Sequence, residues 1–282
     1  MQQKFHIERM DRQRLELALD WAAAEGWNPG LHDAASFFAA DPSGFFMGFL
    51  DDEPVGSISA VSYPGDFGFI GLYIVRPEHR GKGFGLKLWH AAVEHLGERT
   101  VGLDGVIERQ SSYARSGFVT AHRNIRFEWN GPAALETDTA VGRLEPSEFD
   151  AILAYDAALF PGSRDGFLRV WTRQPGCTGL LYRSDDGDIA GYGLLRPCRR
   201  GYKLGPLFAD TPRIAACLLQ AFRPHAGTAP IYIDMPAPNT AALQLAARHG
   251  MRRVFETARM YTPRIPSLPL ERTFGITTYE LG

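Results

Sequence analysis

The chain has 282 residues, of which 45% are hydrophobic and 22% are charged, and its formal net charge is −2. This length is enough for two ordinary domains, and this composition is typical of a globular protein with real cores. The charge gives no support for nucleic-acid or membrane binding. Residues 1–13 carry no apolar stretch of the secretory type, and no apolar run approaches a membrane span.

The chain contains three cysteines, Cys177, Cys198 and Cys217, and no Cys-x-x-Cys motif. An odd number without paired spacing argues against a disulfide framework and against a zinc site. We therefore expect a protein without a metal, located in a reducing compartment such as the cytoplasm.

Hydrophobic periodicity and turn residues predict an alternation of strands and helices along the first half of the chain. The expected strands are residues 5–9, 45–50, 55–62, 67–75, 100–103 and 118–129. The expected helices are residues 11–25, 33–40, 86–96 and 108–116. Strand 67–75 has no formally charged residue, which is typical of a strand buried on both faces.

A basic, glycine-rich turn joins strand 67–75 to the next helix. It reads Arg80-Gly81-Lys82-Gly83-Phe84-Gly85. The first N–H groups of a helix lack an intrahelical partner, and glycines let an anion approach them without meeting a Cβ atom. The turn therefore predicts an anion site, and a tight turn with solvated basic residues is the alternative. Its spacing matches neither the Walker loop nor the dinucleotide fingerprint.

The turn resembles the acetyl-CoA signature of the GNAT N-acetyltransferases, Arg/Gln-x-x-Gly-x-Gly/Ala, at Arg80, Gly83 and Gly85. Residues 73–77 resemble that family's fourth strand and its exit. The resemblance implies that backbone N–H groups of the turn hold the pyrophosphate of acetyl-CoA and that backbone groups of the strand hold its pantetheine and thioester carbonyl. The residues so implied are Tyr73, Ile74, Val75, Arg80, Gly81, Lys82, Gly83, Phe84, Gly85 and Leu86.

The family often protonates the departing CoA thiolate with a tyrosine in a Tyr-x-x-x-Gly-Phe pattern, which Tyr113 fits. A packing tyrosine is the alternative. Asp104, at the expected end of strand 100–103, is our candidate for the base that deprotonates the acceptor amine. An ordinary turn or cap residue is the alternative there, and Asp66, His79 or a water molecule could also serve. Trp27 could contact a cationic acceptor or simply pack in the core.

The second half repeats the first. Gly56 and Gly71 correspond to Gly191 and Gly205 at offsets of 135 and 134, whereas Asp104 corresponds to Asp234 at an offset of 130. The second copy has therefore lost a loop, and the lost piece is the anion turn. It has also lost the tyrosine, because Ala246 stands at the matching place.

We therefore predict an α/β (α+β) protein made of two tandem GNAT folds, each a mixed, mostly antiparallel sheet flanked by helices. Residues 1–131 form the domain that binds acetyl-CoA, and residues 139–282 form a degenerate copy. The first copy has one strand after its last helix, residues 118–129, whereas the second has two, near residues 253–261 and 274–281. The first sheet is therefore expected to be short at an edge that another segment covers.

The resemblance implies an acetyl-CoA-dependent N-acetyltransferase, a monomer or homodimer. Its acceptor would be a primary amine of a small molecule, an amino acid or a protein. The alternative is a non-catalytic acetyl-CoA-binding sensor or interaction module. The basic cluster Arg196, Arg199, Arg200 and Lys203 is expected to be a solvated turn, and contact with an acidic acceptor or with the CoA 3′-phosphate is the alternative.

Overall fold

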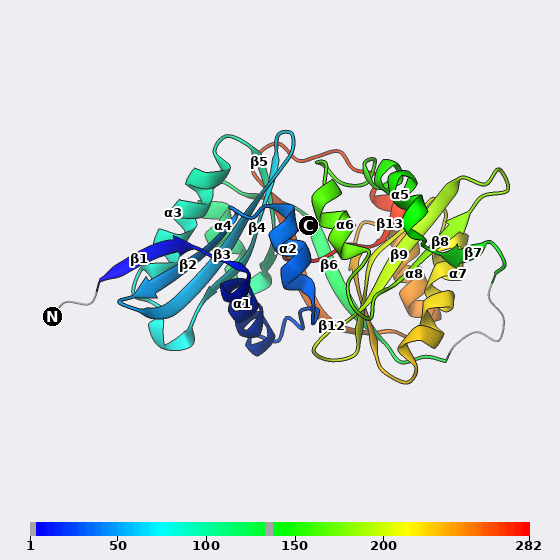
Figure 1. Ribbon diagram of the computed structural model, residues 1–282, viewed down its shortest axis with the longest axis horizontal. Coiled ribbons are helices and arrows are strands. Elements are labelled where there is room, and N and C mark those ends of the chain that lie inside the picture. The colour runs from blue at the N-terminus through cyan, green and yellow to red at the C-terminus, as the bar shows by residue number, and fades with distance from the viewer. Residues whose placement is uncertain (1–3, 133–137) are drawn as a thin grey trace.

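The computed structural model describes residues 4–132 and 138–282 (Figure 1). The strands of the first half are β1 (Phe5–Arg9), β2 (Phe45–Leu50), β3 (Glu53–Tyr63), β4 (Phe67–Val75), β5 (Thr100–Val106) and β6 (Val119–Trp129). Its helices are α1 (Arg12–Ala24), α2 (Asp33–Ala40), α3 (Phe84–Leu96) and α4 (Gln110–Arg115), with 3-10 turns at Pro77–His79 and Ile107–Arg109. Every strand and helix expected in this half is present, within a few residues of the predicted limits.

The second half has the same order of elements. Its strands are β7 (Val141–Arg143), β8 (Thr178–Arg183), β9 (Ile189–Pro197), β10 (Tyr202–Ala209), β11 (Ile231–Pro236), β12 (Arg252–Tyr261) and β13 (Thr273–Gly275). Its α-helices are α5 (Phe149–Asp156), α6 (Asp165–Trp171), α7 (Pro212–Phe222) and α8 (Thr240–Arg248). In the described part of the chain, no helix combines the length and apolar character needed to cross a bilayer.

One sheet runs through both halves, and two strands change sides within it. The strand order is β1-β2-β3-β4-β5-β12-β6-β11-β10-β9-β8-β7. β12, from the second half, therefore lies between β5 and β6, and β6 in turn pairs with β11. Figure 1 shows β12 and β6 crossing between the two halves. The prediction that another segment covers the short edge of the first sheet is confirmed, because β12 pairs along β5.

Each exchanged strand carries a buried ion pair at an equivalent place. Arg259 of β12 lies opposite Asp104 of β5 and binds both carboxylate oxygens, at 3.0 and 2.6 Å. Arg126 of β6 lies opposite Asp234 of β11 and does the same, at 2.6 and 2.8 Å. Both pairs are almost fully buried. Each pair therefore joins a carboxylate of one half to an arginine of the other.

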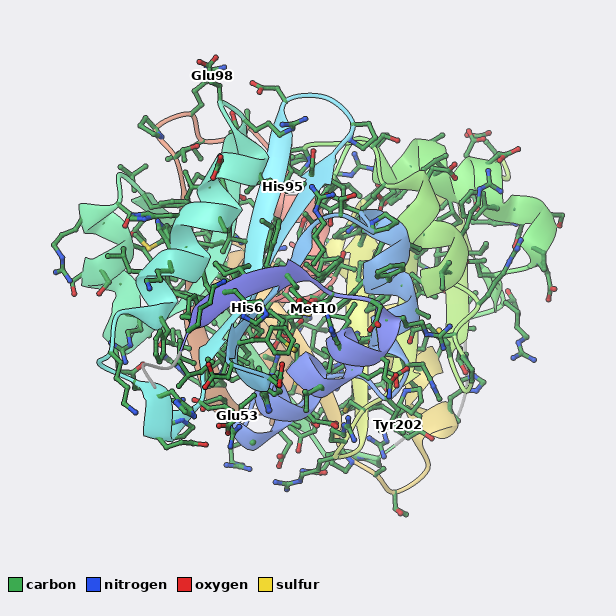
Figure 2. The ribbon with its side chains drawn as sticks, turned by 60° about the vertical axis from the view of Figure 1, so that its left-hand side comes forward. His6, Met10, Glu53, His95, Glu98 and Tyr202 are labelled. Carbon is green, nitrogen blue, oxygen red and sulfur yellow. The ribbon has the colours of Figure 1, made fainter. Side chains whose placement is uncertain are left out.

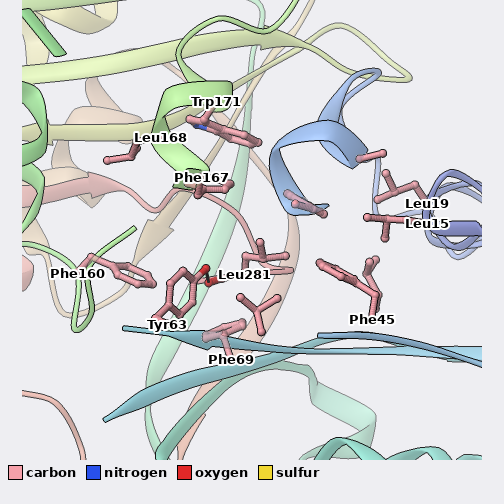
Figure 3. Close-up of a cluster of buried hydrophobic side chains, with 14 of the residues drawn as sticks. Leu15, Leu19, Phe45, Tyr63, Phe69, Phe160, Phe167, Leu168, Trp171 and Leu281 are labelled. Atoms are coloured by element: carbon pink, nitrogen blue, oxygen red, sulfur yellow. Dashed lines mark hydrogen bonds between the residues drawn. The ribbon is translucent and has the colours of Figure 1, made fainter. Parts of the chain in front are cut away.

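The helices cover both faces of the sheet. α3 packs on one face of the first half, and α7 and α8 cover the corresponding face of the second. The opposite faces carry α1, α2, α5 and α6, which meet in one core between the halves. Figure 3 shows Phe45 and Phe69 of the first half close to Phe167, Trp171 and Leu281 of the second. The two halves therefore share a hydrophobic core as well as a sheet.

Two predicted strand limits are wrong. The strand expected at residues 100–103 continues to Val106, because Asp104 and Gly105 stay in the ladder with β12. Asp104 is therefore neither a turn residue nor a cap. The strand expected at residues 274–281 is only β13, Thr273–Gly275. The following residues run buried between the halves, where backbone carbonyls pack on two glycines that have no side chain, Gly205 and Gly71.

Removing the arginine of one buried ion pair tests how much the exchange of strands contributes to stability. Arg259→Ala is expected to lower the free energy of unfolding by about 3–5 kcal/mol, because Asp104 would stay buried without its cation. Chemical denaturation followed by circular dichroism measures this change. Arg253 lies on the same strand, but its pairing with Glu256 is exposed to solvent. Arg253→Ala is the matched control and should cost less than about 1 kcal/mol. Equal costs for both variants would contradict the structural importance of the buried pair.

The first half should not fold independently. A fragment of residues 1–135 lacks β12, so the long edges of β5 and β6 would lose their shared neighbour. We expect this fragment to be insoluble or largely unfolded on expression. Size-exclusion chromatography and circular dichroism measure the outcome. A soluble, monomeric and fully active fragment would show that the second half is dispensable.

Candidate functional site

The site lies where β4 and β5 separate. These strands pair in parallel from Phe67 to Ile70 on β4, opposite Thr100 to Leu103 on β5. Beyond Ile70 the register of β4 with β3 shifts, and Leu72 has a φ of 45°. A β-bulge of this kind bends a strand and re-aims its polar groups. Among the described residues, the β5-facing edge of β4 beyond the bulge has no strand partner, so its backbone groups can bind a ligand.

A cavity of about 380 Å³ opens at this separation. Twelve of the thirteen residues that the sequence singled out for acetyl-CoA binding, acceptor binding and catalysis line its wall. Those that line it are Trp27, Tyr73, Ile74, Val75, Arg80, Gly81, Gly83, Phe84, Gly85, Leu86, Asp104 and Tyr113. Lys82 is exposed and lies outside the lining. The structure therefore brings the predicted residues together, with Lys82 as the exception.

The glycine-rich turn presents free helix N–H groups to the cavity. Gly83 caps α3 with a φ of 83°, and no side chain caps the first N–H groups of the helix. A Cβ atom built on Gly81 or Gly83 would meet nothing within 4 Å, so the space in front of the turn is open. Gly85 is needed for a different reason, because its Cβ would lie 2.8 Å from the Tyr73 hydroxyl. This geometry fits an anion held by backbone N–H groups.

Arg80 turns back from the anion position. Its Nε donates to the Val75 carbonyl at 2.7 Å, and its Nη2 pairs with Glu25 at the end of α1. The guanidinium therefore ties the turn to β4 and to α1. Its charge is partly compensated by Glu25.

Tyr113 lies on α4 above the separated strands. Its ring packs on Trp89, with 5.6 Å between the ring centroids, and a Cβ on Gly105 would lie 2.6 Å from it. Burial, with a smaller contribution from the neighbouring Tyr73, raises the pKa of Tyr113 to about 12. The phenol therefore keeps its proton at neutral pH and is chemically able to give it to a stronger base.

Asp104 reaches the cavity with its carboxylate already engaged. Besides the two bonds from Arg259, Oδ1 accepts from Asn124 Nδ2 at 2.8 Å and from Thr257 Oγ1 at 3.3 Å. Burial raises the pKa of Asp104, and the Arg259 guanidinium opposes that rise. A catalytic role for Asp104 stays a prediction, and its visible contacts are those of a structural ion pair.

Trp27 is held by residues from both halves. Its carbonyl accepts from Arg126 Nη1 at 2.7 Å and from Lys203 Nζ at 3.2 Å. The ring lines the cavity and also packs against the shared core. The basic cluster of the second half is a solvated turn only in part: Arg199 and Arg200 are exposed, whereas Lys203 is buried and Arg196 is buried against Asp33. Burial opposite an acid explains the difference for Arg196.

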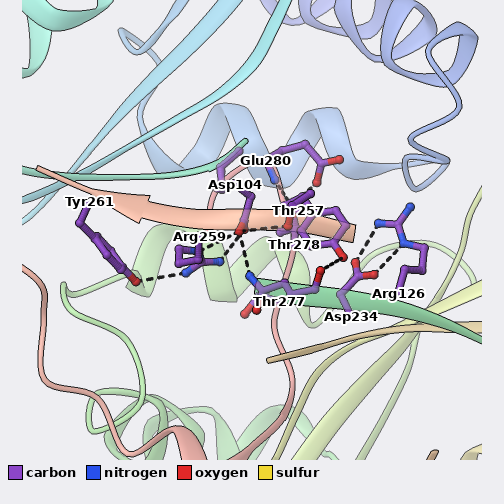
Figure 4. A network of polar contacts seen from close by, with 12 residues as sticks. Asp104, Arg126, Asp234, Thr257, Arg259, Tyr261, Thr277, Thr278 and Glu280 are labelled. Atoms are coloured by element: carbon purple, nitrogen blue, oxygen red, sulfur yellow. Dashed lines mark hydrogen bonds and ion pairs between the residues drawn. The ribbon is translucent and has the colours of Figure 1, made fainter. Parts of the chain in front are cut away.

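The second half contributes four wall residues that were not predicted. They are Phe255, Thr257, Tyr279 and Glu280. The first two lie on β12, and the other two belong to the segment after β13. Figure 4 shows Thr257 and Glu280 in one polar network with Asp104. The sequence contained one indication that a segment of the second half lies beside this cavity, namely the predicted short edge of the first sheet. That indication did not identify which residues of the second half line the wall.

Among the described residues, one cluster of side chains could hold a metal ion. Glu53, Glu78 and His79 bring one donor atom each within 4.8 Å of one another. Figure 2 labels Glu53, at the start of β3. Arg76 pairs with both carboxylates, at 2.7 Å for Glu53 and 2.5 Å for Glu78. A cation there would compete with Arg76, so the cluster is an ion-pair network of the loop.

The equivalent separation in the second half is filled. β10 and β11 pair in parallel only from Tyr202 to Leu204, opposite Ile231 to Ile233. Beyond this, β13 pairs with β10 at Leu207 and Phe208, and the Ile276 N–H donates to the Asp234 carbonyl at 2.8 Å. The chain itself therefore occupies in the second half the place that is open in the first.

Comparisons with known proteins agree with this fold. Residues 12–118 match the model of the Acetyltransferase (GNAT) family, and residues 152–275 match that of an Acetyltransferase (GNAT) domain. The chain is 31% identical over 268 residues to holothin acyltransferase of Pseudoalteromonas sp. (strain SANK 73390), covering 95% of this chain and 91% of that protein.

Solved structures share the fold over nearly the whole chain. A proposed acetyltransferase from Pyrococcus horikoshii has a TM-score of 0.82 and 23% identity, covering 99% of this chain and 96% of that one. A tandem GNAT protein from the clavulanic acid biosynthesis pathway has a TM-score of 0.63 and 13% identity, covering 94% and 100%. With a match in each half and a relative along almost its full length, the chain belongs to the GNAT acetyltransferase family and is a tandem GNAT protein.

Proposed function

We propose that the protein is an acetyl-CoA-dependent N-acetyltransferase that uses only its first half to bind acetyl-CoA. The observation that carries this proposal is the continuity of the cavity. One hollow joins the open glycine-rich turn, the unpaired edge of β4, the Tyr113 phenol and a wall of aromatic and acidic residues. Donor site, proton donor and acceptor site are thus side by side, as a transfer reaction requires.

The residues present fit acetyl-CoA. The N–H groups at the start of α3 would hold the pyrophosphate, and the free edge of β4 would hold the pantetheine arm. Acetyl-CoA supplies an acetyl group activated as a thioester. A backbone N–H of β4 would stabilise the negative charge that develops on the thioester oxygen, an effect typically worth a few kcal/mol. Tyr113 would protonate the departing thiolate.

The acceptor we propose is a primary amine, carried by a small molecule, an amino acid or a protein. The enclosed, partly aromatic wall favours a small molecule. A relative named holothin acyltransferase makes holothin one compound to test. The second candidate function is a non-catalytic acetyl-CoA sensor, and the buried phenol of Tyr113 beside the cavity favours the enzyme. We further propose a cytoplasmic monomer or homodimer, with no metal and no nucleic-acid partner.

Release of CoA over a panel of amines tests the function directly. The wild-type protein is expected to release CoA from acetyl-CoA only when an acceptor amine is present. Mass spectrometry of the amine identifies the acetylated product. Tight acetyl-CoA binding without acetylation of any amine would favour the sensor instead.

The glycine-rich turn predicts a single acetyl-CoA site. Calorimetry should find one acetyl-CoA per chain, because β13 fills the equivalent place in the second half. Gly83→Val should weaken binding by more than about tenfold, since a branched side chain would stand at the phosphate position.

The control for that variant is Gly65→Val. Gly65 also has a positive φ, 98°, and open space around it, but it lies in the β3–β4 turn at the opposite end of β4. This variant carries similar backbone strain and should bind acetyl-CoA normally. Two equivalent sites in the wild type, or unchanged binding by a folded Gly83→Val protein, would overturn the assignment of the turn.

Tyr113→Phe should lower kcat by about 10²-fold or more and leave acetyl-CoA affinity nearly intact, because the ring is kept and only the proton is lost. The raised pKa also predicts that wild-type kcat shows no loss from Tyr113 ionisation below about pH 10. Measuring kcat and the acetyl-CoA Kd on one preparation separates the possible roles. A packing tyrosine would change kcat by less than a few-fold, and a cofactor contact would weaken binding.

The control is Tyr232→Phe. Tyr232 is a buried phenol of the second half that donates to Glu128 at 2.9 Å, away from the cavity. Its loss should affect stability rather than turnover. Near-wild-type turnover of Tyr113→Phe, with chemistry shown to limit the rate, would remove Tyr113 from the reaction.

A further inference from the structure

Glu280 is a buried carboxylate with one oxygen left without a partner. The residue is 2% exposed, and it lines the cavity. Oε2 accepts a hydrogen bond from the Thr278 hydroxyl, whereas Oε1 is buried and has no hydrogen-bond partner among the described residues. An unsatisfied buried acceptor costs about 1–3 kcal/mol, and more when it is charged. A ligand that brings an N–H donor to this oxygen would remove that cost.

The position of Glu280 is fixed by the fold of the first half. Its backbone carbonyl packs on Gly71 at the bulge of β4, where a Cβ would lie 2.1 Å away. Its N–H donates to Thr278 Oγ1 at 2.8 Å, which closes a tight local turn. The backbone of Glu280 is therefore held beside the point at which β4 leaves β5. That is also where the proposed function places the thioester.

Asp104 has no carboxylate oxygen without a partner, because Arg259, Asn124 and Thr257 donate hydrogen bonds to its two oxygens. Arg126 and Arg259 are already ion-paired, and Lys203 Nζ donates to the Trp27 carbonyl. The charged and titratable side chains on the elements packed here are Arg126 on β6, Lys203 on β10, Asp234 on β11, Arg259 on β12, Asp104 on β5, His122 on β6 and Tyr279. Glu280 is thus the carboxylate of this network that offers an oxygen to a ligand.

We propose that Glu280 binds the acceptor amine and takes its proton during acetyl transfer; this rests on the proposed function. The amine nitrogen forms a bond to the thioester carbonyl carbon, and the C–S bond breaks. One N–H proton passes to Glu280, and the CoA thiolate takes a proton from Tyr113. Solvent then returns a proton from Glu280 to Tyr113, so the sum is amide and CoA thiol from amine and thioester.

The same wall defines the class of acceptor. Three aromatic side chains, Trp27, Phe255 and Tyr279, line the cavity with Glu280. The lining guanidinium groups, Arg80 and Arg109, come from the turn before α3 and the 3-10 turn before α4, on the acetyl-CoA side. The wall around Glu280 is therefore mainly aromatic, and the acceptor is a primary amine on a flat, apolar body.

Two matched amines and one substitution test the proposal. Tryptamine should be acetylated with a kcat/KM at least about tenfold above that of propylamine, which carries the amine without the flat ring. Glu280→Gln should lower kcat/KM for tryptamine by about 10²-fold or more. Glu280→Asp should recover part of the rate. Acetyl-CoA binding should change less than twofold in each variant.

Glu271→Gln is the control, because Glu271 is an exposed carboxylate of the same half, in the 3-10 turn Leu270–Arg272. It should leave the rate unchanged. Calorimetry with tryptamine and protein saturated with CoA gives a second readout that needs no turnover. Loss of tryptamine binding in Glu280→Gln supports the amine site even if no amine is acetylated, in which case the proposed function fails.

Three results overturn the assignment of Glu280. The first is a folded Glu280→Gln protein that acetylates tryptamine at the wild-type rate. The proposed function would still stand after that result. Another is equal use of tryptamine and propylamine, which removes the acceptor class. The third is a wild-type protein that neither binds nor acetylates any primary amine of the panel, and then the proposed function falls as well.

Discussion

The structure depends on two buried carboxylates that are neutralised only across the exchange of strands. Asp104 needs Arg259 from the second half, and Asp234 needs Arg126 from the first. Removing one partner of such a pair typically costs about 3–5 kcal/mol, a large share of the stability of a domain. Each half therefore contains a charge that it cannot bury alone. The exchange thus specifies that the halves fold as one unit, and it fixes the register of β12 against β5.

That register has a direct chemical consequence. It places Thr257 and Phe255 of β12 beside the separation of β4 and β5, and the segment after β13 brings Tyr279 and Glu280 to the same cavity. The proposed acetyl-CoA side of the site is built from local sequence, namely a strand, a turn and the helix that follows it. The proposed acceptor side is built from residues more than 130 positions away. The degenerate half therefore contributes wall residues although it lacks the glycine-rich turn.

This division explains what could be predicted from the sequence. β4 was predicted to its limits, because a charge-free run followed by proline and glycines is a local pattern. The turn and Tyr113 followed from local motifs, and they line one cavity. Glu280 could not be found this way, because residues 274–281 alternate like a strand, yet only Thr273–Gly275 pairs with a neighbour. The two glycines on which its carbonyls pack, Gly71 and Gly205, are far away in sequence.

The two halves use one geometric feature for opposite purposes. In each, a parallel pair of strands separates after a few residues and leaves backbone groups that need partners. In the second half β13 and the Ile276 N–H satisfy them, so that half is closed there. In the first half the same chain segment stops short and presents Glu280 to the opening instead of a further strand. The segment from β13 onward therefore completes the sheet of the second half and also places Glu280 in the cavity wall of the first half. In a duplicated fold, the copy that lacks an open site can thus contribute residues to the site of the other copy.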